Sequence, residues 1–290
     1  MDAAWPLDAL APKLREMASG RKTAFLPGDH DPLYAPPGLD APVSVEAQVA
    51  SALARLLTGS ASSLTAPDLY GFGYSSKPKR PGLYQVAAYA DFLEKFLDVL
   101  ELKQVAMVTH DDAGWAGIQL ALAHPERVSH LVILNTPVHR EVWHRLPRVR
   151  LLRRRILGER MAAWLLTKGW LKRILRGWVV HKERMTDQVV EHYYWPFTEG
   201  TRWVMLTMAR DFDSPFQRMP YGEGEIQSLR VPTLILSGET DPIQARRVEE
   251  HGQPDIPHSK QVILEEAGHL LPEDQPQEIA RLILEFVSHA

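Results

Sequence analysis

The chain of 290 residues contains no cysteine, which excludes disulfides, thiolate nucleophiles and cysteine-based metal sites. It also lacks an excess of charge of one sign, because 33 Lys and Arg residues stand against 36 Asp and Glu residues, and the formal net charge is −3. A balance this even gives no overall reason to expect a nucleic acid or an acidic membrane surface as a partner.

Long apolar runs and a leader-like start are missing as well. No window approaches 18 uninterrupted apolar residues, so we expect no membrane span. The first 20 residues lack the basic-then-apolar order of a signal peptide, and we therefore expect a cytoplasmic protein. The length fits one core that carries an inserted subdomain.

Apolar runs of strand length alternate with amphipathic helical patterns along much of the chain. This alternation is typical of an α/β fold with a doubly wound, mostly parallel sheet. Strands are predicted at residues 23–26, 63–66, 104–108, 128–134, 232–237 and 261–264. Helices are predicted at residues 8–19, 43–57, 84–100, 113–124 and 276–287.

The alternation is interrupted between residues 138 and 227. Basic, Trp-containing helical patterns occupy this segment, and no run in it has the apolar quality of the strands on either side. We therefore predict an α/β core made of residues 1–137 and 228–290, with a helical cap inserted at residues 138–227.

The predicted turn after the strand at 104–108 carries a candidate nucleophile. Asp111 has small residues two positions before and after it, Thr109 and Ala113, as the strained turn around a nucleophile requires. If Asp112 were the nucleophile, His110 would occupy the first of these positions, which fits less well.

Two further turns hold Asp241 and His269, each shortly after a predicted strand. The C-terminal ends of parallel strands meet at one edge of a sheet, where ligands bind. Asp111, Asp241 and His269 therefore form a candidate catalytic triad, in the chain order nucleophile, acid, histidine.

Four segments resemble the haloalkane dehalogenase and epoxide hydrolase branch of the α/β-hydrolase superfamily: APDLYGFGYSSKP (66–78), THDDAG (109–114), LALAHPERV (120–128) and AGHLLPEDQP (267–276). The resemblance implies a nucleophilic aspartate at Asp111, and it implies neither a cofactor nor a metal. Asn135 matches the subgroup whose acid lies after the later strand, as Asp241 does, and is expected at the substrate pocket.

A carboxylate nucleophile restricts the chemistry. An aspartate, with a reference pKa of about 3.9, is already ionised at neutral pH. Its attack on an acyl carbon gives a high-energy anhydride, whereas attack on a saturated carbon that bears a halide or an epoxide oxygen gives an ordinary ester. The expected substrates are thus a small apolar molecule and water, with His269, oriented by Asp241, deprotonating the water that hydrolyses the Asp111 ester.

Two places depart from the branch that the chain resembles. Haloalkane dehalogenases have a tryptophan after the nucleophile, whose N–H stabilises the departing halide, and here this residue is Asp112. Its carboxylate either faces the pocket, where it opposes an anionic leaving group, or turns outward and caps the helix. The oxyanion loop corresponds to Gly28, Asp29 and His30, with Asp29 where dehalogenases often use an asparagine to hold the halide.

The predicted cap supplies aromatic side chains that are candidates for a substrate pocket. Epoxide hydrolases of the branch protonate the opening oxygen with phenolic groups of the cap, and Tyr193, Tyr194 and Tyr221 are candidates, with Trp195 beside them. Aromatic residues of a helical cap also serve as ordinary packing groups, and this alternative applies to each of the four.

The cap is also basic, because residues 140–184 hold 14 Arg and Lys against three Glu. Such a segment either steers an anionic substrate or acidic partner, or is a solvated face. No motif for nucleic-acid binding accompanies it. Beside the ester mechanism, two functions stay open: a hydrolase with altered chemistry on another small apolar substrate, and a non-catalytic ligand-binding protein of this fold.

Overall fold

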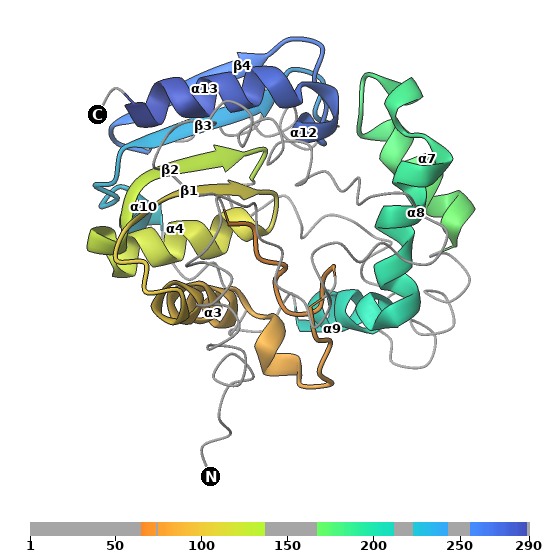
Figure 1. The fold of residues 1–290 in the computed structure, drawn as a ribbon, viewed down its shortest axis with the longest axis horizontal. Coiled ribbons are helices and arrows are strands. Elements are labelled where there is room, and N and C mark those ends of the chain that lie inside the picture. The colour runs from red at the N-terminus through yellow and green to blue at the C-terminus, as the bar shows by residue number, and fades with distance from the viewer. Residues whose placement is uncertain (1–64, 74, 137–166, 212–222, 243–255, 289–290) are drawn as a thin grey trace.

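The computed structural model describes residues 65–73, 75–136, 167–211, 223–242 and 256–288 (Figure 1). The strand predicted at 23–26 and the helices predicted at 8–19 and 43–57 lie outside these ranges, as do residues 63 and 64 of the strand predicted at 63–66. Four of the candidate site residues also lie outside them: Gly28, Asp29, His30 and Tyr221.

Four parallel strands form the sheet of the described part of the chain. They are β1 (Val105–His110), β2 (Val128–Leu134), β3 (Thr233–Gly238) and β4 (Ser259–Leu264), and they lie side by side in the order β1-β2-β3-β4. Each neighbouring pair is parallel. The four corresponding predictions are confirmed to within two residues at every strand end.

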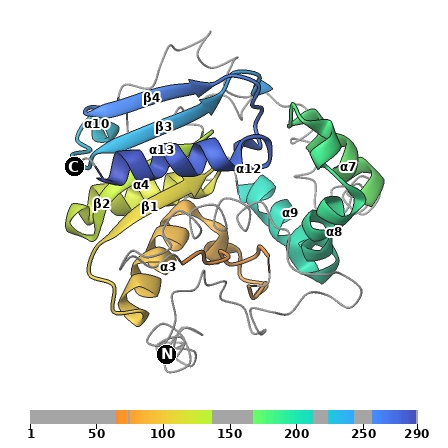
Figure 2. The ribbon, with the colours of Figure 1, turned by 45° about the horizontal axis from the view of Figure 1, so that its top comes forward.

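Successive residues of β2 face two different helical layers. Leu131 and Ile133 pack in one apolar cluster with residues of α4 (Ala113–Ala123). Val132 and Leu134 pack in another with residues of α13 (Pro276–Ser288), which crosses the strands in Figure 2. Because successive side chains of a strand point to opposite faces, helices cover both faces of the sheet, and the doubly wound α/β architecture is confirmed.

The helix predicted at 84–100 begins two residues later than expected. A separate 3-10 turn, η1 (Pro81–Tyr84), precedes α3 (Val86–Val99), and the buried Tyr84 hydroxyl donates to the carbonyl of Pro78 at 2.5 Å. Phe92 and Phe96 of α3 pack with Tyr84 in an aromatic cluster. A second 3-10 turn, η2 (Pro125–Arg127), joins α4 to β2.

Helices from the segment between β2 and β3 lie beyond the ends toward which the strands point (Figure 1). In chain order these elements are α7 (Lys168–Gly177), η4 (Lys182–Arg184), α8 (Asp187–Pro196), η5 (Phe197–Thr201) and α9 (Arg202–Asp211). Threonine side chains cap two of them, because Thr167 accepts from the N–H of Trp170 and Thr186 from that of Val189. Within the described ranges, no helix has the length and apolarity that crossing a bilayer requires.

The short helix α10 (Glu223–Ile226) lies just before the predicted end of the cap at residue 227. Ile226 packs in the same apolar cluster as Trp115 of α4 and Ile235 of β3. The chain has therefore already returned to the sheet layer at α10. The boundary of the cap at residues 138 and 227 stays a prediction.

Gly114 allows the first turn of α4 to approach the end of β2 closely. A Cβ atom at this position would lie 1.9 Å from Oγ1 and 2.4 Å from Cγ2 of the buried Thr136. We therefore predict that Gly114→Ala lowers the free energy of unfolding by about 1–3 kcal/mol, measured by urea denaturation, because the added methyl group overpacks this contact.

Gly169→Ala in α7 is the matched control, because a Cβ atom there meets nothing within 4 Å. In this helix alanine should leave the free energy of unfolding unchanged or raise it by up to about 1 kcal/mol. Equal stability of the two variants would contradict the close approach of α4 to β2.

Candidate active site

The turn between β1 and α4 holds Asp111 in a strained backbone conformation. Its φ of 50° lies in the left-handed region, which costs a residue other than glycine roughly 1–2 kcal/mol. The turn is held by hydrogen bonds: the Asp111 N–H donates to Leu134 O at 3.1 Å, and Thr136 Oγ1 and the Gly114 N–H donate to Asp111 O, each at 3.0 Å. The sharp turn presents the Asp111 side chain at the C-terminal edge of the sheet.

Three residues from three strand ends meet at this edge. The Nε2 atom of His269 lies 3.7 Å from Oδ1 of Asp111, and its Nδ1 atom lies 3.0 Å from Oδ2 of Asp241. Asp241 and His269 are buried, whereas the side chain of Asp111 is 35% exposed. The arrangement leaves a carboxylate within reach of a ligand and a histidine behind it that a second carboxylate orients.

The two carboxylates control the protonation of His269. Burial lowers its pKa, but its contacts with Asp111 and Asp241 prevail and raise the pKa to about 10. Burial raises the pKa of Asp111, but His269, the His110 ring and the N–H of Asp112 together lower it below its ordinary value. At neutral pH the pair is thus an imidazolium beside an ionised carboxylate.

This ion pair also makes stability depend on pH. The pKa of His269 is about 10 in the folded state against an ordinary value of 6.5, so the native state holds the proton more tightly. The contribution of His269 to the stability of the folded state is therefore complete below pH 6.5 and is lost as the pH rises through about 10.

Asn135 ties together the turns that carry the acid and the histidine. It is fully buried, with φ of 43°, and its Nδ2 donates to the carbonyls of Gly268 and His269 at 2.8 Å each. Its Oδ1 accepts from the N–H of Gly238 at 3.0 Å. The side chain of Asn135 is thus engaged with backbone groups and positions the His269 turn, and its place at a substrate pocket stays a prediction.

Asp112 is the N-cap residue of α4, and its side chain makes no capping hydrogen bond to that helix. Its backbone is already helical, with φ of −59° and ψ of −28°. A capping side chain usually requires an extended backbone at this position. In the structure, Asp112 thus does not cap the helix through its side chain.

Two aromatic rings border His269, and the sequence analysis singled out neither of them. The Trp178 ring, which follows α7, meets the imidazole edge-on with ring centroids 5.1 Å apart. Nε2 of His110 lies 3.1 Å from the carbonyl oxygen of His269. His110 could have been suspected from its place beside Asp111, but nothing local marks Trp178 among the eight tryptophans of the chain.

The described cap aromatics pack among themselves and against the histidine turn. Tyr193 and Tyr194 border an apolar cluster that includes Leu270, and the Tyr193 hydroxyl donates to Oε1 of Glu273 at 3.3 Å. The Tyr194 ring stacks with that of Phe197 at 6.4 Å, and Trp195 is half-buried in α8. The packing role therefore accounts for the contacts of both tyrosines, and a role in proton donation stays a proposal.

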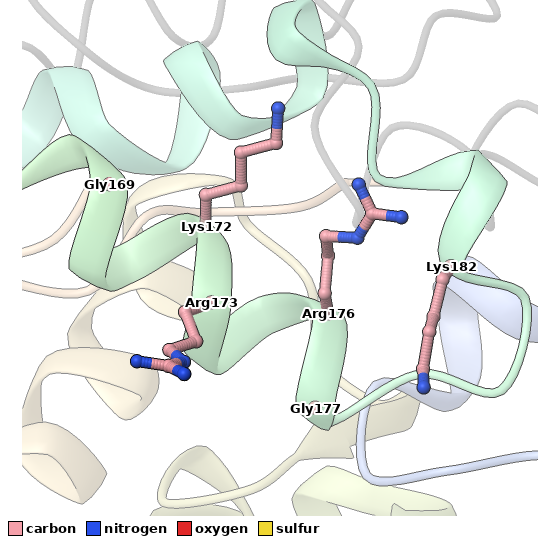
Figure 3. A pocket seen from close by; sticks show the side chains of 6 residues that line it. All are labelled: Gly169, Lys172, Arg173, Arg176, Gly177 and Lys182. Carbon is pink, nitrogen blue, oxygen red and sulfur yellow. The ribbon is translucent and has the colours of Figure 1, made fainter.

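A basic depression on α7 is separate from these residues (Figure 3). Its lining residues are Gly169, Lys172, Arg173, Arg176, Gly177 and Lys182. Figure 3 shows the four cationic side chains spreading in different directions. Lys172 pairs with Asp187 at 2.5 Å and the neighbouring Lys168 with Glu191, so this part of the basic segment has the character of a solvated helix face.

The described residues offer carboxylate and imidazole chemistry. Among them, no group of three His, Asp or Glu side chains is arranged to hold a metal ion. What the arrangement provides is an ionised, partly exposed carboxylate and a buried imidazole that can exchange a proton with water next to it.

We predict that the His269 ring stays protonated up to about pH 10 in an NMR titration of the ring signals. Asp111→Asn should lower this pKa, because it removes one of the two carboxylates that raise it. A midpoint near the ordinary value of 6.5 in the unmodified protein would contradict the ion pair.

We predict that Asn135→Asp lowers the free energy of unfolding in urea by about 3 kcal/mol or more, because a carboxylate oxygen would face the carbonyls of Gly268 and His269. Gln104→Glu makes the same chemical change at an exposed amide and should alter stability by no more than about 0.5 kcal/mol. A similar, small loss in both variants would show that Asn135 does not hold the histidine turn.

Known proteins resemble this chain in sequence and in fold. A haloalkane dehalogenase of Psychrobacter cryohalolentis is 24% identical over 80% of this chain and 76% of its own length. A 2-hydroxymuconate semialdehyde hydrolase of Pseudomonas putida is 26% identical over 78% and 76%, respectively. The solved structure of an epoxide hydrolase from an endophytic Streptomyces has a similar fold, with a TM-score of 0.70 over 91% of this chain and 88% of that chain at 17% identity.

The sequence model of the alpha/beta hydrolase fold matches residues 31–276, which include both the described sheet and the segment between β2 and β3. The relatives carry out more than one kind of hydrolysis, and so the match defines the family and not the reaction. The chain belongs to the α/β-hydrolase fold family.

Proposed function

We propose that this hydrolase forms a covalent alkyl ester at Asp111 and hydrolyses it with a water that His269 activates, acting on a haloalkane or an epoxide. The observation that carries the proposal is the position of Asp111, partly exposed at the strained turn and 3.7 Å from His269. Members of this family that act on acyl groups commonly carry a serine at the turn, and none occurs at positions 109–114 here.

The first step uses Asp111 as the nucleophile. One of its carboxylate oxygens attacks the saturated carbon, the new C–O bond forms, and the bond to the halogen or the epoxide oxygen breaks with its electron pair leaving on that atom. The lowered pKa of Asp111 keeps the carboxylate ionised and thus ready to attack at neutral pH.

Ester formation then prepares His269 for the second step. An esterified Asp111 has no negative charge, so one of the two contributions that raise the pKa of His269 is lost, and the imidazole releases its proton more easily. The neutral imidazole accepts a proton from water, and the hydroxide attacks the ester carbonyl carbon. The alcohol departs and Asp111 is restored, while Asp241 stabilises the imidazolium that forms.

The half-buried Asp112 bears on the choice between the two substrate types. Asp112 directly follows the nucleophile, and a negative charge so near it in the chain opposes a halide ion, which departs with a full negative charge. An epoxide oxygen becomes a hydroxyl when it takes up a proton, for which we propose a phenolic hydroxyl of Tyr193, Tyr194 or Tyr221 as the donor, and it leaves as part of the same molecule. Asp112 therefore favours the epoxide over the haloalkane as the substrate class.

The organisation around this reaction follows the same proposal. The inserted helices α7 to α9 cover the site as a cap, the substrate is a small apolar molecule, and the reaction needs no cofactor. We also propose that the protein works in the cytoplasm and binds no nucleic acid. The loop with Gly28, Asp29 and His30 is proposed to supply the backbone N–H groups that hold the oxyanion.

The experiment that tests the proposal traps the ester. In His269→Gln the first step should proceed while the second slows by roughly 10²–10⁴-fold, the usual contribution of a general base. After incubation with a panel of bromoalkanes and epoxides, intact-mass spectrometry should show the variant with one added substrate group, and peptide mapping should place it on Asp111.

The matched control carries Asp111→Asn together with His269→Gln and should gain no mass. If the single variant forms no adduct with the panel but binds these molecules reversibly, the protein is a non-catalytic member of the fold. An adduct on any residue other than Asp111 would equally overturn the proposal.

A further inference from the structure

The segment that follows the catalytic histidine contains a buried carboxylate outside the triad. Asp274 ends the short helix α12 (Leu271–Asp274), is 1% exposed and lies five residues after His269. A buried carboxylate is unfavourable unless hydrogen bonds replace its hydration. Its partners therefore show what the residue holds in place.

The Asp274 carboxylate accepts hydrogen bonds from two different parts of the chain. The N–H of Gly268, next to the catalytic histidine, donates to Oδ2 at 2.8 Å. The N–H groups of Val180 and His181, which follow α7 in the inserted segment, donate to Oδ1 at 3.1 and 2.9 Å. Three backbone donors on one ionised group form charge-assisted bonds, which are about twice as strong as neutral ones.

Arg184 strengthens the same junction from the inserted segment. Its guanidinium donates to the backbone carbonyl of Glu273 at 3.0 Å and to that of Asp274. These hydrogen bonds join the inserted segment to the backbone of the helix that carries Asp274.

The two backbones also touch directly at Trp178. The N–H of Leu270 donates to the carbonyl of Trp178 at 3.1 Å. A Cβ atom on Gly268 would lie 2.4 Å from that carbonyl oxygen, so the approach requires a residue without a side chain. Gly268 and Leu270 flank His269, and both are therefore fixed against Trp178.

We infer that Asp274 is a positioning residue that fixes the His269 turn to the inserted helices and holds the Trp178 ring against the imidazole. The consequence for catalysis rests on the proposed function: the turn must keep His269 within reach of the water that attacks the Asp111 ester, and of Asp111 itself at 3.7 Å. The junction itself is independent of that function, because it consists of contacts within the folded chain.

Asp274→Asn is the variant that tests the inference, because one carboxylate oxygen becomes an NH₂ group that cannot accept. Hydrogen exchange measured by mass spectrometry should become about tenfold faster, or more, in peptides that cover residues 178–181 and 267–270. In rapid-mixing kinetics, hydrolysis of the ester should slow about tenfold while ester formation keeps its rate, because only the second step uses His269.

Asp187→Asn is the matched control, since it also changes a carboxylate of the inserted helices to an amide, but one that pairs with Lys172 at the surface. It should change neither the exchange of these peptides nor either rate. Trp178→Leu removes the ring contact but leaves the Asp274 hydrogen bonds, so it should slow ester hydrolysis without faster exchange at 267–270, and it tests the inference even if Asp274→Asn does not fold.

The outcomes separate the two claims. Unchanged exchange in Asp274→Asn overturns the inference whatever the protein catalyses. Faster exchange with no ester formed in any variant supports the junction and overturns the proposed function. Equal slowing of ester formation and hydrolysis overturns the positioning role, because a general loss of structure would affect both steps.

Discussion

His269 is held between two carboxylates of different character, and the site depends on this arrangement. Asp241 is buried and lies at hydrogen-bond distance, 3.0 Å from Nδ1, whereas Asp111 is partly exposed and lies 3.7 Å from Nε2. Both raise the pKa of the imidazole against the effect of burial. Because Asp111 contributes to the raised pKa of His269, the proton affinity of the imidazole depends on whether Asp111 carries its charge.

Such an arrangement requires a rigid frame, since each of the three residues comes from a different strand end. Asn135, directly after β2, supplies part of this frame. Its side-chain amide binds the carbonyls of Gly268 and His269 and the N–H of Gly238 at the end of β3. Asp274 supplies the other part from the inserted segment. The positive φ values of Asp111 and Asn135 are maintained because these hydrogen bonds fix both turns.

The sheet and its flanking helices were predictable because their signals are local. The nearly continuous apolar run of β2 follows from the burial of both faces of a parallel sheet, and Thr109 and Ala113 around Asp111 mark the sharp turn. The triad residues could be grouped because parallel strands end at one edge of a sheet.

The supporting residues could not be predicted in the same way. Asp274 has the sequence pattern of an acid in the first turn of a helix, and its partners at residues 180 and 181 are more than 90 positions away. Asn135 follows a strand, where a ligand-binding role is the usual expectation, and the backbone groups that it binds are more than 100 positions away. Whether Asp112 caps α4 depended on its backbone conformation, which is helical and which no spacing rule specifies.

The central claim, that Asp111 becomes esterified, is tested most directly by a single turnover in ¹⁸O-labelled water with enzyme in excess over an epoxide or a bromoalkane. If hydroxide attacks the ester carbonyl carbon, the label enters the Asp111 carboxylate and the first alcohol formed carries unlabelled oxygen. Label found in the alcohol, with an unlabelled peptide containing Asp111, would show that water attacks the substrate directly and would contradict the account.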